Sequence, residues 1–187
     1  MDYIKLIHSD IDNERLATEM FNLITAFNLQ EHPQISITSL AGENNWINGT
    51  GKRHLLKYPE RYFNKVNEFL RGSYIEQCIN RYPEFYRWRI MKVIPRATYS
   101  IHDDGLPNRQ NIRLHIPIIS NPQAFLTFYD LAPKDDTTVT VYHANLKVGH
   151  SYEVNTTGLH TAVNYGMHDR YHMVGVKYIK EQIRGLK

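Results

Sequence analysis

Two residues with metal-binding side chains stand two positions apart in the chain: His102 and Asp104. In an extended segment alternate side chains point to the same face, so this imidazole and this carboxylate point together. His160, in a separate segment, is the candidate for a third ligand. Two imidazoles and one carboxylate on one face of an octahedral metal ion leave three positions open, an arrangement typical of iron(II) oxygenases. The spacing therefore predicts a metal site made of these three side chains.

The segment 111–118 has one aliphatic face and one polar face. Aliphatic residues occupy every second position from Ile112 to Ile118, whereas Arg113 and His115 lie between them. Alternation of this kind predicts a β-strand. If the aliphatic face packs on a core, Arg113 and His115 face a polar cavity. The alternative is an ordinary amphipathic strand whose polar face meets water.

A further candidate is Arg170, which follows His160 by ten residues. One tight turn after the His160 strand would bring Arg170 back beside it on the next strand. A guanidinium inside a barrel needs an anionic partner, because a lone buried charge is costly. A dicarboxylate that chelates the metal at one end would supply that partner through a bidentate contact. The alternative is a surface turn residue paired with Asp169.

The elements that must position these residues change type along the chain. Helical spacing and possible capping by Asp10 or Asp12 predict a helix over residues 11–27, and a second helix is predicted over residues 59–80. A polar, glycine-rich loop is expected over residues 42–57. Short segments rich in β-branched and aromatic residues then predict strands over residues 85–93, 98–102, 111–119, 124–129, 137–142, 160–165 and 171–178. Such a series indicates a sandwich, jelly roll or barrel, with a short helix over residues 179–187.

Three parts of the chain are candidates for the mouth of the cavity. They are the loop residues 44–54, Tyr99 and the segment 124–129. Ordinary packing is the alternative reading of each.

Composition narrows the possible partners and the compartment. The formal net charge is +3 and no basic stripe is present, which argues against nucleic-acid binding. The single cysteine, Cys78, allows no intramolecular disulfide. The first residues lack the layout of a signal peptide, and no apolar run approaches the roughly 18 residues needed to span a bilayer. We therefore expect a soluble cytoplasmic protein without nucleic-acid or membrane partners.

Three segments together resemble the aspartyl/asparaginyl β-hydroxylase family, which includes the cis-type proline hydroxylases. They are His102-x-Asp104, then Arg113-Leu114-His115-Ile116-Pro117-Ile118 with Asn121-Pro122, and then Leu159-His160-Thr161-Ala162-Val163-Asn164 with Arg170. The resemblance covers residues 98–176, under half of the chain. It departs from the family at Gly149-His150-Ser151-Tyr152, where a Gly-Glu-aromatic-Trp sequence is common.

The resemblance implies a mainly β fold, a double-stranded β-helix of the jelly-roll, cupin-like type with N-terminal helices packed outside. In this reading residues 1–187 form a single domain. Residues 1–83 are a mostly helical and loop support region, and residues 84–178 are the β-helix core.

The resemblance also implies roles for the candidate residues. Iron(II) would be held by His102, Asp104 and His160. Arg170 would bind the distal carboxylate of the cosubstrate 2-oxoglutarate, and Arg113 and His115 would contact cosubstrate or substrate near the metal. The implied reaction is hydroxylation of a small molecule or peptide, either an amino acid or an Asp, Asn or Pro-type side chain.

Two other function classes remain open at this point. A cupin-type metal-dependent hydrolase or isomerase would need a metal site but no arginine opposite it. A non-catalytic binding module would keep the shape without the chemistry. The complete set of His102, Asp104, His160 and Arg170 argues against the binding module.

Overall fold

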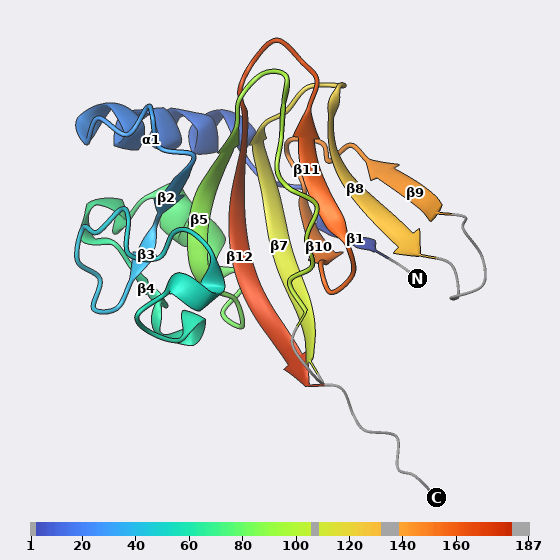
Figure 1. Cartoon of the computed structure of the whole chain (residues 1–187). Helices are drawn as coiled ribbons and strands as arrows, with labels where there is room; N and C mark the ends of the chain where they lie inside the picture. Colours follow the sequence, from blue (N-terminus) through green and yellow to red (C-terminus); the bar gives the residue numbers. More distant parts are fainter. Residues whose placement is uncertain (1–2, 106–108, 132–138, 181–187) are drawn as a thin grey trace, which may run out of the picture.

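A computed structural model describes residues 3–105, 109–131 and 139–180, and its core is built from two antiparallel sheets (Figure 1). The larger sheet contains, in spatial order, β1 (Ile4–His8), β10 (Ser151–Asn155), β7 (Arg109–Ile119), β12 (Arg170–Lys180), β5 (Tyr86–Val93) and β2 (Gln34–Ser36). The smaller sheet contains β6 (Ala97–Thr98), β11 (His160–Asn164), β8 (Ala124–Leu131) and β9 (Val139–Ala144). Helix α1 (Asn13–Ala26) lies outside the larger sheet (Figure 1). The prediction of a mainly β jelly roll with helices outside is confirmed.

The two faces of β7 have opposite characters, as its sequence predicts. The aliphatic residues from Ile112 to Ile118 are buried in a core that they share with α1 and with the indole of Trp88 on β5. Fully burying one such aliphatic side chain stabilises the fold by about 1.5–3 kcal/mol. The opposite face of β7, with Arg113 and His115, lines a cavity between the two sheets. The reading of this strand as one with a solvent-facing polar side is therefore wrong.

Helix α1 begins where the sequence predicts it. Asp12 is the N-cap, and its carboxylate accepts a hydrogen bond from the backbone N–H of Arg15 at 3.1 Å. Asp10, the other candidate cap, instead pairs with Arg81 at 2.8 Å. The buried stripe of Leu16, Met20, Leu23 and Ile24 packs against the larger sheet.

The predicted helix over residues 59–80 is wrong for most of its length. Only α2 (Tyr74–Asn80) is α-helical. The preceding chain forms 3-10 turns η2 (Glu60–Tyr62) and η3 (Glu68–Leu70) around the short strand β4 (Lys65–Val66), which pairs with β3 (Thr38–Ser39). The side-chain amide of Asn67 donates to the carbonyl of Ser36 at 3.0 Å and so holds the chain in this path. Gly72 then adopts a left-handed φ of 78°, which a continuous helix does not allow.

Three strands of the larger sheet were not predicted. The first two, β1 and β2, come from the region expected to be a helical and loop support. The third, β10, lies between the strands predicted over residues 137–142 and 160–165. The short helix predicted over residues 179–187 is wrong at Ile179 and Lys180, which belong to β12, and the rest lies outside the described residues. Among the described residues, no helix has both the length and the apolar character needed to cross a bilayer.

Gly175 marks a close approach between β12 and the core. A Cβ atom at this position would lie 2.8 Å from the indole of Trp88, whose side chain is fully buried. Gly175→Ala should therefore destabilise the protein by about 1–3 kcal/mol through overpacking, measured by denaturant unfolding. Gly158→Ala is the matched control, because a Cβ there meets no atom within 4 Å. Equal stability of the two variants would contradict this account of the core.

Candidate metal centre

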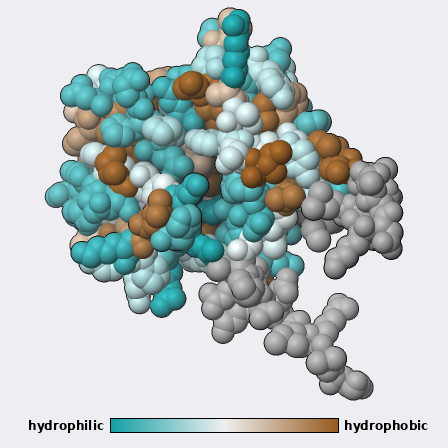
Figure 2. Space-filling model, in the orientation of Figure 1, coloured by the Kyte–Doolittle hydropathy of each residue, from teal (hydrophilic) through white to brown (hydrophobic). Residues whose placement is uncertain are grey.

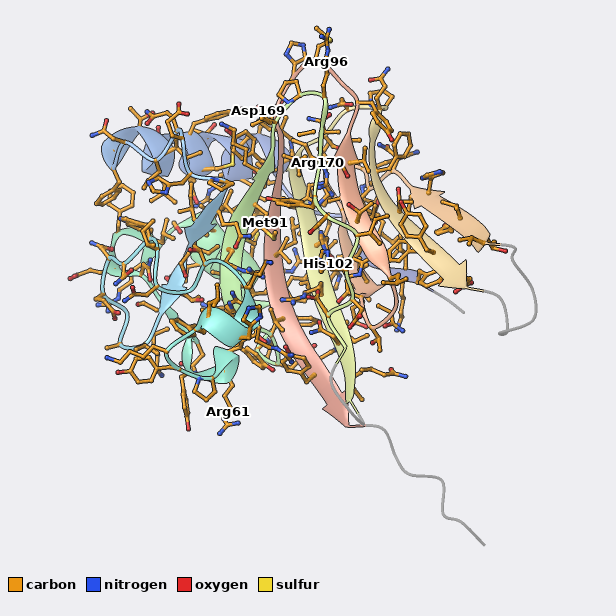
Figure 3. The ribbon with its side chains drawn as sticks, in the orientation of Figure 1. Arg61, Met91, Arg96, His102, Asp169 and Arg170 are labelled. Carbon is orange, nitrogen blue, oxygen red and sulfur yellow. The ribbon has the colours of Figure 1, made fainter. Side chains whose placement is uncertain are left out.

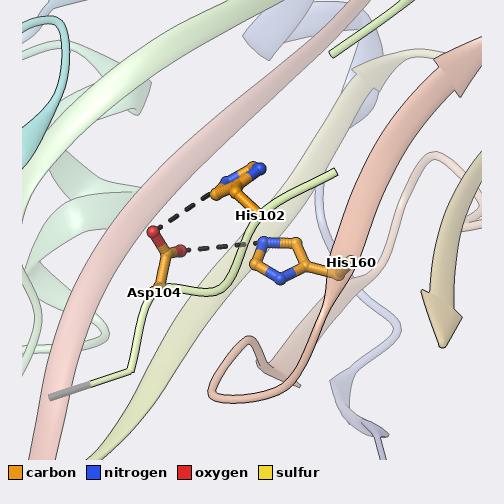
Figure 4. Close-up of side chains that lie close together, drawn as sticks. All are labelled: His102, Asp104 and His160. Atoms are coloured by element: carbon orange, nitrogen blue, oxygen red, sulfur yellow. Dashed lines mark ion pairs between the residues drawn. The ribbon is translucent and has the colours of Figure 1, made fainter. Parts of the chain in front are cut away.

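Three predicted ligands converge on one point of the cavity (Figure 4). The ligand atoms of His102, Asp104 and His160 all lie within 4.8 Å of one another. Backbone pairing produces this convergence, because the N–H of His102 donates to the carbonyl of His160 at 3.1 Å and the reverse bond is 2.8 Å. The N–H of Asp104 donates to the carbonyl of Thr156 at 3.0 Å, which fixes the carboxylate two residues along the same edge.

Backbone carbonyls orient both imidazoles. Nδ1 of His102 lies 2.7 Å from the carbonyl oxygen of Ser100, and Nδ1 of His160 lies 2.9 Å from that of Gly158. A carbonyl only accepts hydrogen bonds, so each Nδ1 carries the proton and each Nε2 keeps its lone pair. Both Nε2 atoms face Asp104, at 4.0 Å from Oδ1 for His102 and 3.7 Å from Oδ2 for His160. This outer support is the arrangement that metal-binding histidines require.

Asp104 is held in its ionised form. Burial alone would raise the pKa of this carboxyl group, but the Arg113 guanidinium and the two imidazoles outweigh burial and hold the pKa well below its usual range. Nε and Nη2 of Arg113 both contact Oδ2 of Asp104 at 3.0 Å. Arg113 is thus engaged with a metal-ligand candidate, and its predicted contact with cosubstrate or substrate stays a prediction.

The cavity that contains these ligands has a volume of about 490 Å³ and lies between the two sheets. Strands β5, β7 and β12 line one side of it, and β8 and β11 line the other. Figure 2 shows a recess near the centre of this face, bordered largely by hydrophilic residues. In Figure 3, Met91, Arg170 and His102 are labelled toward the middle of the molecule, whereas Arg61 and Arg96 lie at its edges. Of the segments predicted to shape the mouth, residues 51–54, Tyr99 and Leu126 line the cavity, and their place at its mouth stays a prediction.

A pair of buried histidines lies deeper in the same cavity. Nδ1 of His115 and Nδ1 of His172 are 3.2 Å apart, and Nε of Arg170 donates to Nε2 of His172 at 3.1 Å. Nη2 of Arg170 also lies 3.1 Å from Nδ1 of His172, so this guanidinium contacts both ring nitrogens of His172. Burial, strengthened by the charge of Arg170, lowers the pKa of both histidines well below the usual range. Both rings are therefore neutral.

Four arginines are buried among the described residues, and all four line the cavity: Arg87, Arg89, Arg113 and Arg170. Two of them have carboxylate partners. Arg113 pairs with Asp104, and Arg87 contacts the buried carboxylate of Glu60. Arg113 and Arg87 together hold the pKa of Glu60 below its usual value, although its burial acts in the opposite direction.

Arg170 and Arg89 lack a carboxylate within ion-pair distance in the part of the chain that the structure describes. Each side chain is only 4% exposed. Burial lowers the pKa of Arg170 to about 10, and it lowers that of Arg89 as well. Nη1 of Arg89 donates to Oε1 of Gln34 at 3.0 Å, while its Nε has no hydrogen-bond partner. Two buried guanidinium groups therefore line the cavity without a carboxylate partner among the described residues.

Sequence reasoning missed Arg89 and His172. The strand β5 reads Tyr-Arg-Trp-Arg-Ile-Met-Lys-Val, with buried Trp88 and Ile90 alternating with two arginines. This alternation matches the one that identified Arg113 and His115, so the signal was present. Applied to β12, it would also have placed His172 beside Arg170.

Comparison with solved structures establishes the fold. AviO1 from Streptomyces viridochromogenes Tue57 has a TM-score of 0.55 at 15% identity, covering 100% of this chain and 92% of that one. SnoN, a non-heme alpha ketoglutarate dependent epimerase from nogalamycin biosynthesis, has 0.53 at 12%, covering 96% and 78%. The carbocyclase SnoK from the same biosynthesis has 0.51 at 14%, covering 95% and 79%. No family model and no curated protein sequence matches the chain. The predicted double-stranded β-helix is therefore confirmed as the fold.

The ligand cluster predicts metal binding that depends on His160. His160→Ala should weaken Mn(II) binding at least about 100-fold, because it removes a direct ligand and not only an outer-shell partner. Electron paramagnetic resonance of free Mn(II) measures the affinity. The matched control is His143→Ala on β9, whose ring contacts Thr127 Oγ1 at 2.9 Å outside the cluster. Equal loss in both variants, or none in His160→Ala, would refute the assignment.

The two arginines of β5 should differ in their effect on stability. Arg87→Met leaves the carboxylate of Glu60 without its closest cation and should cost about 3 kcal/mol or more. Arg89→Met removes a buried charge that has no carboxylate partner, so the free energy of unfolding should stay unchanged or rise. Denaturant unfolding of both variants without added ligands measures the difference. A large loss in Arg89→Met would show that this arginine has a structural role.

Proposed function

We propose that this chain is an iron(II)- and 2-oxoglutarate-dependent oxygenase that hydroxylates a small substrate. The observation that carries the proposal is one cavity holding both a cluster of two histidines and one aspartate and a buried arginine without a carboxylate partner. The cluster suits iron(II), and the arginine suits the far end of a dicarboxylate that chelates the metal.

The residues present fit both groups. His102, Asp104 and His160 would hold iron(II), with Nε2 of each imidazole unprotonated for that purpose. Arg170 would hold the distal carboxylate of 2-oxoglutarate through charge-assisted hydrogen bonds. When bound, iron(II) and 2-oxoglutarate supply the oxidising power, as the 2-oxoglutarate is converted to succinate and carbon dioxide with consumption of dioxygen.

The solved structures support this assignment by analogy. SnoN has been crystallised with Fe3+, alpha ketoglutarate and nogalamycin RO, and that structure has a TM-score of 0.52 at 11% identity. The same fold carries an epimerase in SnoN and a carbocyclase in SnoK. Our proposal of hydroxylation rests on the resemblance of the motifs around His102, Arg113 and His160 to the aspartyl/asparaginyl β-hydroxylases and cis-type proline hydroxylases.

The protein's own groups have separable tasks in this reaction. Arg113 keeps Asp104 ionised and aimed, so that the carboxylate binds metal instead of a proton. The neutral pair His115 and His172 fills the interior beside Arg170 without adding positive charge. A substrate that fills the cavity would displace water from it, which would strengthen the charge interactions inside. Residues 51–54 and Tyr99 at the predicted mouth would contact the substrate.

The function is tested by anaerobic titration of iron(II)-loaded protein with 2-oxoglutarate, followed by the weak visible charge-transfer band, and by succinate release in air. Wild-type protein should give both signals. Arg170→Gln should keep the metal but raise the 2-oxoglutarate concentration needed about 10–100-fold, because a charged hydrogen-bond partner is lost. Arg61→Gln, on an exposed side chain stacked on Tyr62, is the control. Folded, metal-loaded protein that gives no band would favour a cupin-type hydrolase or isomerase.

A further inference from the structure

Arg89 has features of a ligand-binding group that the metal and cosubstrate do not use. It lines the cavity from β5, its side chain is 4% exposed, and its Nε lacks a hydrogen-bond partner. Nη1 of Arg89 donates to the neutral amide of Gln34 at 3.0 Å. Burying a guanidinium without an anionic partner is unfavourable, so a bound anion would stabilise Arg89 in this position.

The charges in the cavity leave room for such an anion. Four buried guanidinium groups face two buried or half-buried carboxylates, those of Glu60 and Asp104. A divalent metal ion adds two positive charges, and 2-oxoglutarate adds two negative charges. These buried groups, together with the metal ion and 2-oxoglutarate, therefore still carry an excess of two positive charges. Arg170 is satisfied in this state, whereas Arg89 is not.

Strand register separates Arg89 from Arg170. Arg170 pairs across the sheet with Val93, whereas Arg89 pairs with Val174. Four residues along β12 correspond to about 13 Å in an extended strand. The two guanidinium groups are therefore carried on backbone positions that are well separated along the sheet. Val174 also pairs with His115 on β7, so Arg89 lies level with His115, toward the metal-ligand cluster from the Arg170 end.

Arg89 is also connected to the predicted mouth. Oε1 of Gln34 accepts hydrogen bonds from both Arg89 Nη1 and the backbone N–H of Gly51, at 3.0 Å each. Gly51 begins the mouth segment, and the next two residues, Lys52 and Arg53, are basic and line the same cavity. A negatively charged molecule that enters past this segment therefore meets positive charge along its path to Arg89.

We propose that the primary substrate is a small carboxylic acid whose carboxylate binds Arg89, an inference that rests on the proposed function. Gln34 holds the guanidinium in place, and the cosubstrate occupies Arg170. A cavity of about 490 Å³ that contains both molecules leaves space for a compact acid. An interior carboxylate site favours a free acid over an internal residue of a protein chain.

The test uses protein loaded with Mn(II) and 2-oxoglutarate, in which no turnover occurs, and acetate as the probe. The 2-oxoglutarate affinity is measured first by calorimetry. Acetate at about 100 mM should then raise the melting temperature of loaded wild-type protein by about 3 °C over chloride of equal ionic strength. Acetamide, which is neutral and of similar shape, should cause no rise.

Variants assign the effect to one residue. Arg89→Met should keep the 2-oxoglutarate affinity, leave the melting temperature of the unloaded protein unchanged or higher, and lose the acetate shift. Arg61→Met, on an exposed side chain, should keep the shift. A shift that persists in Arg89→Met, or no shift in loaded wild-type protein, would overturn the inference and leave the oxygenase assignment intact. Loss of 2-oxoglutarate affinity in Arg89→Met would make Arg89 a cosubstrate residue and also overturn the inference. Failure of wild-type protein to bind 2-oxoglutarate would end both proposals.

Discussion

The burial of four arginines around one cavity, against two carboxylates, is the constraint on which the rest of the site depends. Glu60 pairs with Arg87 and Asp104 pairs with Arg113, and those pairs anchor the 3-10 turn η2 and the candidate metal-ligand cluster to the larger sheet. Arg89 and Arg170 remain without a carboxylate in the described structure, and their guanidinium groups contact the neutral side chains of Gln34 and His172 instead. Buried charges without partners lower the stability of the protein while the site is empty, and they strengthen the binding of an anion.

Successive side chains of a β-strand point to opposite faces, so one strand can carry core residues on one face and cavity residues on the other. On β5 and β7 one face carries Trp88 and the aliphatic residues from Ile112 to Ile118, which pack against α1. The other face carries the arginines and His115. Arg87 shows the local cost, because it adopts a left-handed φ of 50° where the pairing of β5 with β12 is irregular. Its guanidinium donates to the carbonyls of Gly49 and Gly51, which offsets that strain and holds the mouth segment on the sheet.

The sequence pointed to His102, Asp104 and His160 as candidate metal ligands, and the structure brings them together. A period of two applies directly to the extended segment that carries His102 and Asp104. The sequence also allowed α1, β7 and the strand of His160 to be predicted. The apolar spacing over residues 59–80 is helical, but the prediction of one long helix there was wrong. Asn67 makes a tertiary hydrogen bond and Gly72 adopts a left-handed φ, and apolar spacing reveals neither. The alternation on β5 carried the signal for Arg89, but its position relative to Arg170 depends on the pairing of β5 with β12, which no local pattern predicts.

The most direct measurement is a crystal structure of the protein with Mn(II) and 2-oxoglutarate. The account predicts Mn(II) bound by His102, Asp104 and His160, and the distal carboxylate of 2-oxoglutarate within hydrogen-bond distance of Arg170. Arg113 should still contact Asp104, and Arg89 should remain free of the cosubstrate. Metal bound at other residues, or a distal carboxylate that contacts Arg89 in place of Arg170, would contradict the assignment of the site.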